Sequence, residues 1–187
     1  VFKEALQITP TLNQWPDSEA EWIFEALKLG LRDYLFKTNQ KQIGIGISGG
    51  IDSSVAAVLA VEAMGKENVI ALSLPSPYTS SETREDAKKL ADRLGIRFWE
   101  LEIAEVFEAF QKALKPFEPS GTTLENLQPR IRMTLLMAMT NQLGGVLLNT
   151  SNKSELATGY STLYGDSAGA LAPLGDLTKR QVRLLAQ

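Results

Sequence analysis

The sequence contains neither cysteine nor histidine. Without cysteine the chain can form no disulfide, offer no thiolate to a metal and use no thiol as a nucleophile. The absence of cysteine also fits a reducing compartment. Without histidine the chain has no imidazole base and no histidine metal ligand. Any chemistry must therefore depend on carboxylates, lysine, arginine, hydroxyl groups, backbone dipoles or a bound cation.

The sequence also lacks an excess of positive charge. Its formal net charge is −3, with 44% hydrophobic and 22% charged residues. A general nucleic-acid or membrane-surface binder needs a basic excess, so we expect neither kind of partner. No apolar run approaches the roughly 20 residues that cross a bilayer, and no secretory signal is visible. These features favour an ordinary globular, cytoplasmic protein.

Short apolar segments alternate with longer, helix-like ones. Buried strands are predicted at 43–47, 69–74, 96–103 and 146–149. Helices are predicted at 17–34, 52–64, 81–94, 104–114 and 124–142, around 154, and from 178 onward. The pattern indicates βαβ crossovers, and hence one α/β domain over residues 1–187 with a doubly wound parallel sheet covered by helices on both faces. Ligands of such sheets bind at the carboxyl ends of the strands.

Two segments depart from this regular pattern. Pro129 falls inside the long predicted helix, where it should kink the helix or delay its start. Residues 163–177 are rich in glycine and show little periodicity, so we expect a functional or mobile loop there.

The segment Ser-Gly-Gly-Ile-Asp-Ser-Ser at 48–54 lies between a predicted strand and a predicted helix. Its two glycines permit close backbone approaches, and its N–H groups, hydroxyls and helix N-terminus together form an anion site. No lysine follows the glycines, so this is not a Walker loop. Asp52 suits such a site if a divalent cation joins it to phosphates. The alternative is a tight turn in which Asp52 or Ser53 merely starts a helix.

This segment resembles the pyrophosphate-binding loop of the N-type ATP pyrophosphatases, which have an adenine nucleotide alpha hydrolase-like, Rossmann-like fold. Those enzymes cleave ATP between its α- and β-phosphates and adenylate a substrate oxygen. Four further stretches resemble the NAD synthetase branch in order and spacing. They are L-G-L-R-D-Y at 29–34, E-N-L-Q-P-R-I-R at 125–132, T-S-N-K-S-E-L-A-T-G at 150–159 and Y-G-D-S-A-G-A-L-A-P-L-G-D-L-T-K at 164–179.

The resemblance implies a role for each matching residue. ATP contacts are implied for Gly46, Ser48, Gly49, Gly50, Asp52, Ser53, Ser54 and Thr150. Contacts with deamido-NAD are implied for Asn126, Arg130 and Glu155, and Mg²⁺ ligation for Asp52 and Glu155. Catalytic roles near the reacting phosphate are implied for Asp166 and Lys179.

Each of these assignments has a purely structural alternative. Glu155 has the spacing of a capping box with the residue three positions before it. Lys179 could be a solvated charge beside a helix cap, and Arg130 and Arg132 could lie on an exposed helix face. Asp166 could be a simple turn residue. Agreement of five segments with one family favours the functional assignments.

The activity implied by the resemblance is a two-step amidation. ATP, with Mg²⁺, would adenylate the nicotinate carboxylate of deamido-NAD and release pyrophosphate, and ammonia would then displace AMP to give NAD. Leu163 and Ala170 stand where the small ammonia-dependent enzymes tend to carry lysine and aspartate. The surrounding stretch instead resembles the glutamine-dependent branch, in which a glutaminase domain with a catalytic cysteine precedes the synthetase domain.

The resemblance also implies a homodimer or a larger homo-oligomer. Because the chain has no cysteine, we expect the glutaminase domain to be absent from it. Domains of the family normally continue past the position of Gln187, so we expect the synthetase domain to be truncated at its C-terminus. Other possible functions remain open at this point. They are another ATP pyrophosphatase, such as a GMP synthetase ATPase domain or a tRNA-modifying enzyme, and a non-catalytic nucleotide-binding fragment.

Overall fold

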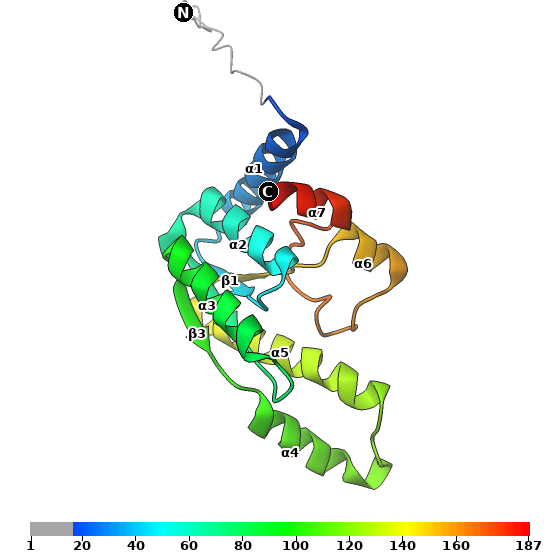
Figure 1. The fold of residues 1–187 in the computed structure, drawn as a ribbon. Coiled ribbons are helices and arrows are strands. Elements are labelled where there is room, and N and C mark those ends of the chain that lie inside the picture. The colour runs from blue at the N-terminus through cyan, green and yellow to red at the C-terminus, as the bar shows by residue number, and fades with distance from the viewer. Residues whose placement is uncertain (1–16) are drawn as a thin grey trace, which may run out of the picture.

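A four-stranded parallel sheet with the order β3-β2-β1-β4 is the centre of the fold (Figure 1). The structure is a computed structural model that describes residues 17–187. The strands are β1 (Ile43–Gly46), β2 (Val69–Ser73), β3 (Arg97–Glu100) and β4 (Val146–Leu148). Ile43 of β1 pairs with Val69 on one side and Val146 on the other. The predicted parallel α/β sheet is therefore confirmed.

Helices cover both faces of this sheet. They are α1 (Glu19–Lys37), α2 (Ile51–Met64), α3 (Ser81–Leu94), α4 (Ala104–Leu114), α5 (Thr122–Leu143), α6 (Lys153–Thr158) and α7 (Lys179–Leu185), with short 3-10 turns η1 (Lys66–Asn68) and η2 (Lys115–Phe117). Val69 and Ala71 of β2 pack with α1, α2, α3 and α7, whereas Ile70 and Leu72 pack with α4 and α5. The alternation of side chains along each strand thus produces two cores, one on each face, as a doubly wound fold requires.

The Ile-Gly-Ile-Gly pattern of β1 follows from these two faces. Ile43 and Ile45 are buried on the α1 and α2 side. The glycines face α5, and a Cβ atom on Gly44 would lie only 2.4 Å from the Thr140 hydroxyl oxygen. The glycines therefore let α5 approach the sheet closely, which brings the middle of α5 to the end of β1.

Helix α5 closely matches its predicted range of 124–142, but the late start that Pro129 predicted is wrong. The helix begins at Thr122, so Pro129 lies inside it and does not delay its start. An internal proline removes one backbone hydrogen bond at a cost of about 3 kcal/mol. Leu127 and Ile131, on either side of it, are buried in the core beneath the sheet, and this burial offsets the cost.

The segment 163–177 contains no helix or strand, in agreement with the prediction of a loop, but one of its residues bridges to the edge of the sheet. Leu171 forms a parallel bridge with Leu148 of β4. The backbone N–H of Ala170 donates to the Leu147 carbonyl at 2.8 Å, and that of Asn149 donates to the Leu171 carbonyl at 2.9 Å. Leu174 and Leu177 are buried in the core. These contacts fix the segment beside the carboxyl end of β4.

No helix within residues 17–187 has the length and apolar character needed to cross a membrane.

Candidate functional site

Two adjoining cavities open at the carboxyl ends of β1, β2 and β4. The larger cavity, of about 390 Å³, lies between these strand ends and α5. The smaller cavity, of about 180 Å³, lies between the 48–54 loop and α6. Ser48, Thr150 and Asp166 line both, so the two spaces meet at these residues. This is the edge of the sheet where the sequence predicted a ligand.

The 48–54 loop presents a helix N-terminus to the smaller cavity. Gly50 is the N-cap residue of α2 and makes no side-chain capping bond, so Asp52 and Ser53 lie in the first turn of the helix, as the structural alternative stated, without capping it. The hydroxyls of Ser53 and Ser54 donate to the Gly50 carbonyl at 3.0 and 2.9 Å. The first N–H groups of α2 are therefore available to an anion, and the helix dipole favours negative charge there.

Gly49 is required by the geometry of this loop. Its φ angle is +77°, and a Cβ atom there would lie 2.6 Å from the Thr83 carbonyl oxygen of α3. We expect Gly49→Ala to lower the free energy of unfolding by about 2 kcal/mol or more, because strain and a backbone clash add. The matched change Gly50→Ala, at φ −85°, should alter it by less than about 1 kcal/mol.

Urea denaturation of both variants measures this difference. Equal stability of the two variants would contradict the requirement for glycine at position 49.

Asp52 joins three separate parts of the chain at the smaller cavity. Its Oδ2 atom forms an ion pair with the Lys179 Nζ atom of α7. Its Oδ1 atom accepts a hydrogen bond from Asn152 Nδ2 at 2.9 Å. Thr178 does cap α7, as the structural alternative stated. Lys179 is nevertheless not a solvated charge, because its side chain is 34% exposed and is held against Asp52.

Glu155 fits both of its sequence interpretations. Its carboxylate accepts a hydrogen bond from the Asn152 N–H at 3.2 Å, and the Asn152 side chain accepts one from the Glu155 N–H at 3.1 Å. This is the capping box of the structural alternative. Glu155 also lines the smaller cavity together with Asp52. The cap therefore holds the carboxylate at the site.

The donor set at the smaller cavity suits Mg²⁺. This ion takes oxygen ligands and is usually held by one or two carboxylates together with substrate phosphates and water. Asp52 and Glu155 supply two carboxylates to one cavity, next to a helix N-terminus that favours phosphate. Within residues 17–187 no cluster of three acidic side chains forms a complete cage. A Mg²⁺ ion held there by the two carboxylates would take its other ligands from a bound phosphate and from water.

Hydrogen bonds from three other residues hold Asp166 at the junction of the two cavities. Its carbonyl accepts hydrogen bonds from Asn149 Nδ2 at 2.9 Å and from Ser151 Oγ at 3.2 Å. Its carboxylate accepts a hydrogen bond from the Thr162 N–H at 2.6 Å, and the residue lies in a turn, as the structural alternative predicted. The turn nevertheless places Asp166 where both cavities meet.

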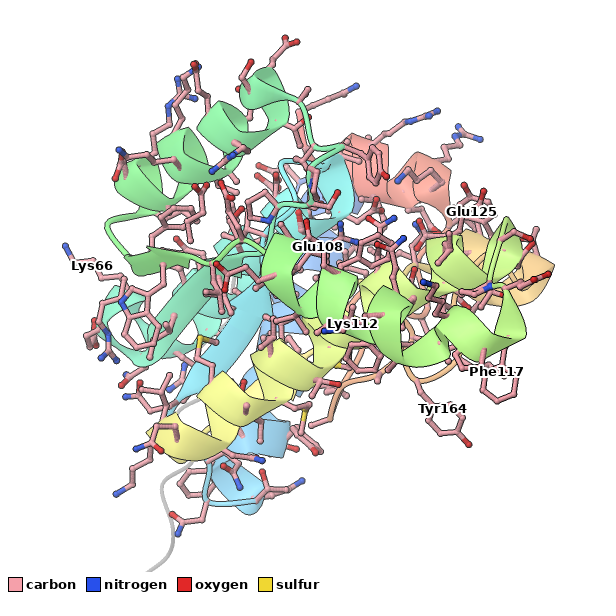
Figure 2. The ribbon with its side chains drawn as sticks, turned by 90° about the horizontal axis from the view of Figure 1, so that it is seen from below. Lys66, Glu108, Lys112, Phe117, Glu125 and Tyr164 are labelled. Atoms are coloured by element: carbon pink, nitrogen blue, oxygen red, sulfur yellow. The ribbon has the colours of Figure 1, made fainter. Side chains whose placement is uncertain are left out.

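Asn126 and Arg130 contact the neighbouring segment of the chain. The Thr162 hydroxyl donates to Asn126 Oδ1 at 2.8 Å, and Arg130 Nε donates to the Leu163 carbonyl at 3.1 Å. In the described part of the chain, neither residue lines the two cavities. Figure 2 labels Glu125 and Tyr164, the sequence neighbours of Asn126 and Leu163, and both lie at the right of the view. Asn126 and Arg130 therefore lie beside the cavities, and their predicted contact with substrate stays a prediction.

Sequence reasoning gave Arg132 no separate role, although it lines the larger cavity. Its Nε atom donates to the Leu74 carbonyl at 2.9 Å. Burial lowers the pKa of Arg132, while the nearby charge of Asp166 acts to raise it. Arg84, at the same cavity, donates to Glu100 at 2.6 Å and to Glu102 at 2.8 Å, and the hydrogen bond to Glu100 is the main cause of its raised pKa. Of the two arginines that line this cavity, Arg84 is therefore paired with carboxylates, whereas Arg132 donates to a neutral carbonyl.

Two asparagines were also missed as parts of the site. Asn149 positions the Asp166 segment, and Asn152 holds Asp52. Capping-box spacing identified Asn152 as a helix cap, but no sequence signal pointed to its second partner.

Comparison with known proteins gives one consistent result. The family model described as NAD synthase matches residues 23–187. The glutamine-dependent NAD(+) synthetase of Thermotoga maritima is 49% identical over 177 residues, which are 92% of this chain and 30% of that protein. The chain thus spans about a third of the length of this curated relative.

Solved structures agree with the family match. The glutamine-dependent NAD+ synthetase of Acinetobacter baumannii, in complex with adenosine diphosphate, superimposes with a TM-score of 0.89 at 41% identity, covering 93% of this chain and 34% of that one. The NMN synthetase of Francisella tularensis superimposes with a TM-score of 0.85 at 34% identity, covering 90% of this chain and 70% of that one. The chain belongs to the NAD synthase family, as a synthetase domain of the glutamine-dependent type.

Proposed function

We propose that this chain carries out the ATP- and Mg²⁺-dependent amidation of deamido-NAD to NAD. An adenylated nicotinate would be the intermediate, with AMP and pyrophosphate as the other products. The observation that carries the proposal is the meeting of Asp52 and Lys179 beside the uncapped N-terminus of α2. A helix N-terminus and a carboxylate at one cavity, with an ammonium paired to that carboxylate, are suited to holding a polyphosphate together with its metal.

Each of the two cavities would hold a different part of the ATP molecule. The 48–54 loop would hold the phosphates that leave as pyrophosphate. The larger cavity, lined by Leu72, Leu136 and Leu148, offers apolar walls to the adenosine, and Arg132 adds a positive charge. The α-phosphate would then lie near the junction at Thr150 and Asp166. The Acinetobacter relative is in complex with adenosine diphosphate, which supports nucleotide binding in a protein of this family.

Catalysis would come from positioning and electrostatics. When the nicotinate carboxylate attacks the α-phosphate, negative charge grows on the phosphoryl oxygens, and Lys179 can stabilise it. Mg²⁺ bound to Asp52 and Glu155 would neutralise phosphate charge. The reaction needs no covalent enzyme nucleophile, in agreement with a chain that has no cysteine and no histidine.

The substrate that carries the carboxylate is the open point within the family. We propose deamido-NAD, with Asn126, Arg130 and Glu155 in its site. The mononucleotide analogue is the specific alternative, because the Francisella relative is named an NMN synthetase. Isothermal titration with deamido-NAD, nicotinate mononucleotide or xanthosine monophosphate, in the presence of α,β-methylene-ATP, separates the possibilities.

The proposal predicts measurable binding of deamido-NAD only. Tight binding of xanthosine monophosphate would favour a GMP synthetase-like activity, and tight binding of the mononucleotide would move the substrate to the shorter acid.

The remaining expectations are part of the same proposal. We propose one synthetase domain over residues 1–187, ammonia as the attacking nucleophile, and a glutaminase domain as its source in a longer protein. The cytoplasmic location and the homodimer stay predictions. A non-catalytic nucleotide-binding domain is the alternative from another class, and it would bind ATP without forming AMP.

A further inference from the structure

Among the residues within 17–187 that cap a helix with a side-chain hydrogen bond, Asn152 alone is completely buried, whereas Ser18, Ser80 and Thr178 are exposed. The exposed fraction of Asn152 is 0%, and in the described part of the chain it belongs to the small group of large side chains that are fully inaccessible. A buried amide must satisfy its hydrogen bonds within the protein. Asn152 does so with two acidic residues, Asp52 and Glu155, that line the smaller cavity.

Capping alone does not require an asparagine. A cap needs only a side-chain oxygen, which serine, threonine and aspartate also provide. The other helices with a side-chain cap in residues 17–187 use hydroxyl groups, from Ser18, Ser80 and Thr178. The amide nitrogen of Asn152 is therefore not needed by α6.

The bond to Asp52 explains the extra nitrogen. The Glu155 N–H can only donate, so the Asn152 amide must turn its oxygen toward it and its nitrogen toward Asp52. Asp52 is 100 residues away in the sequence. A serine is too short to reach this carboxylate, and an aspartate would repel it.

This arrangement leaves one oxygen of Asp52 for a cation. Asn152 occupies Oδ1 with a neutral donor, while Oδ2 faces the Lys179 ammonium. The same asparagine holds the Glu155 carboxylate through its backbone N–H. Both carboxylates that would bind Mg²⁺ are thus oriented by one residue that lines neither cavity itself.

We propose that Asn152 is a positioning residue for the metal–nucleotide complex, which it orients through Asp52 and Glu155. The proposal rests on the proposed function, because it requires that complex to bind at Asp52. Residues that hold metal ligands in place typically contribute about 10- to 100-fold to metal affinity or activity.

The decisive variant is Asn152→Ser, which keeps a capping hydroxyl and removes the donor to Asp52. Binding is measured by electron paramagnetic resonance of free Mn²⁺, titrated into the protein with saturating α,β-methylene-ATP. We expect Asn152→Ser to weaken Mn²⁺ binding by about 10-fold or more. If the substituted protein does not fold, Asn152→Thr, which also caps and fills more of the space, is measured in its place.

Two controls separate positioning from stability and from the proposed function. Ser18→Ala removes a cap from α1, far from the site, and should lower the melting temperature without changing Mn²⁺ binding. Mn²⁺ binding within twofold of the unsubstituted protein in Asn152→Ser would overturn the positioning role alone. Equal binding in the unsubstituted protein and in Asp52→Asn would overturn the metal site itself, and the positioning role with it.

Discussion

Asp52→Asn should reduce turnover by about a thousandfold or more while leaving the fold intact. The substitution keeps the shape of the side chain and an oxygen that can accept from Asn152 Nδ2. It removes the negative charge that faces Lys179 and that would bind Mg²⁺. Since the Asp52 and Lys179 side chains are only 18% and 34% exposed, removing one charge leaves the other partly buried without its partner, and we expect the free energy of unfolding to fall by about 1 to 3 kcal/mol, too little to unfold the protein.

Asp33→Asn is a matched control for this prediction. It also removes a carboxylate that pairs with a lysine, but on the exposed surface of α1, where Asp33 lies 2.6 Å from Lys37. Turnover should therefore be unchanged. Steady-state kinetics and thermal melting of both variants provide the comparison. A folded Asp52→Asn protein with near-normal turnover would refute the metal role.

Lys179→Met should lower kcat by about 10²- to 10³-fold, with a much smaller change in the KM for ATP. Methionine keeps most of the length of the lysine stem, so the change removes mainly the ammonium. If Lys179 stabilises charge that develops in the transition state, its loss appears in kcat more than in substrate binding. Initial rates at saturating Mg²⁺, over a range of ATP concentrations, measure the two constants.

The neighbouring residue provides the control for Lys179. Arg180 follows it in α7 but is exposed, and Arg180→Met should have turnover close to that of the unsubstituted protein. If both substitutions reduced turnover equally, a general loss of positive charge would explain the result. Unchanged kcat in Lys179→Met would make the ion pair with Asp52 a structural contact only.

The regular parts of the fold were predictable because their signals are local. Helix α4 has the bounds that its apolar pattern predicted, and α3 ends at Gly95, whose left-handed conformation suits glycine. Strand β3 is shorter than the predicted 96–103. Beyond Glu100 the chain still donates to β2, from Leu101 to Ser73 and from Ile103 to Pro75. Pro75 has no N–H to return, so the ladder ends.

Tertiary contacts explain what the local pattern could not. Pro129 predicted a late start for α5, which is wrong, because burial of its neighbours keeps the residues before it helical, and the kink stays a prediction. Residues 163–177 contain no helix or strand, as predicted, but the pairing of this segment with Leu147 and Asn149 depends on their being next to it in space.

The candidate site likewise has a local part that was predictable from the sequence and long-range contacts that were not. The 48–54 loop is one continuous segment between a strand and a helix, so its local geometry, a glycine turn that leads into a helix N-terminus, was predictable. The contacts of Asp52 with Asn152 and Lys179 join residues that are 100 and 127 positions apart. Only the fold brings them together. Resemblance to a family indicated Lys179, whereas nothing in the sequence indicated the second bond of Asn152.

The most direct test of the account is a single incubation with ATP, Mg²⁺, deamido-NAD and ammonium in which AMP, ADP, pyrophosphate and NAD are all quantified. If the proposed reaction is correct, AMP, pyrophosphate and NAD appear in equal amounts and ADP does not appear. Formation of ADP in place of AMP would contradict cleavage between the α- and β-phosphates. Formation of AMP without NAD would contradict deamido-NAD as the substrate.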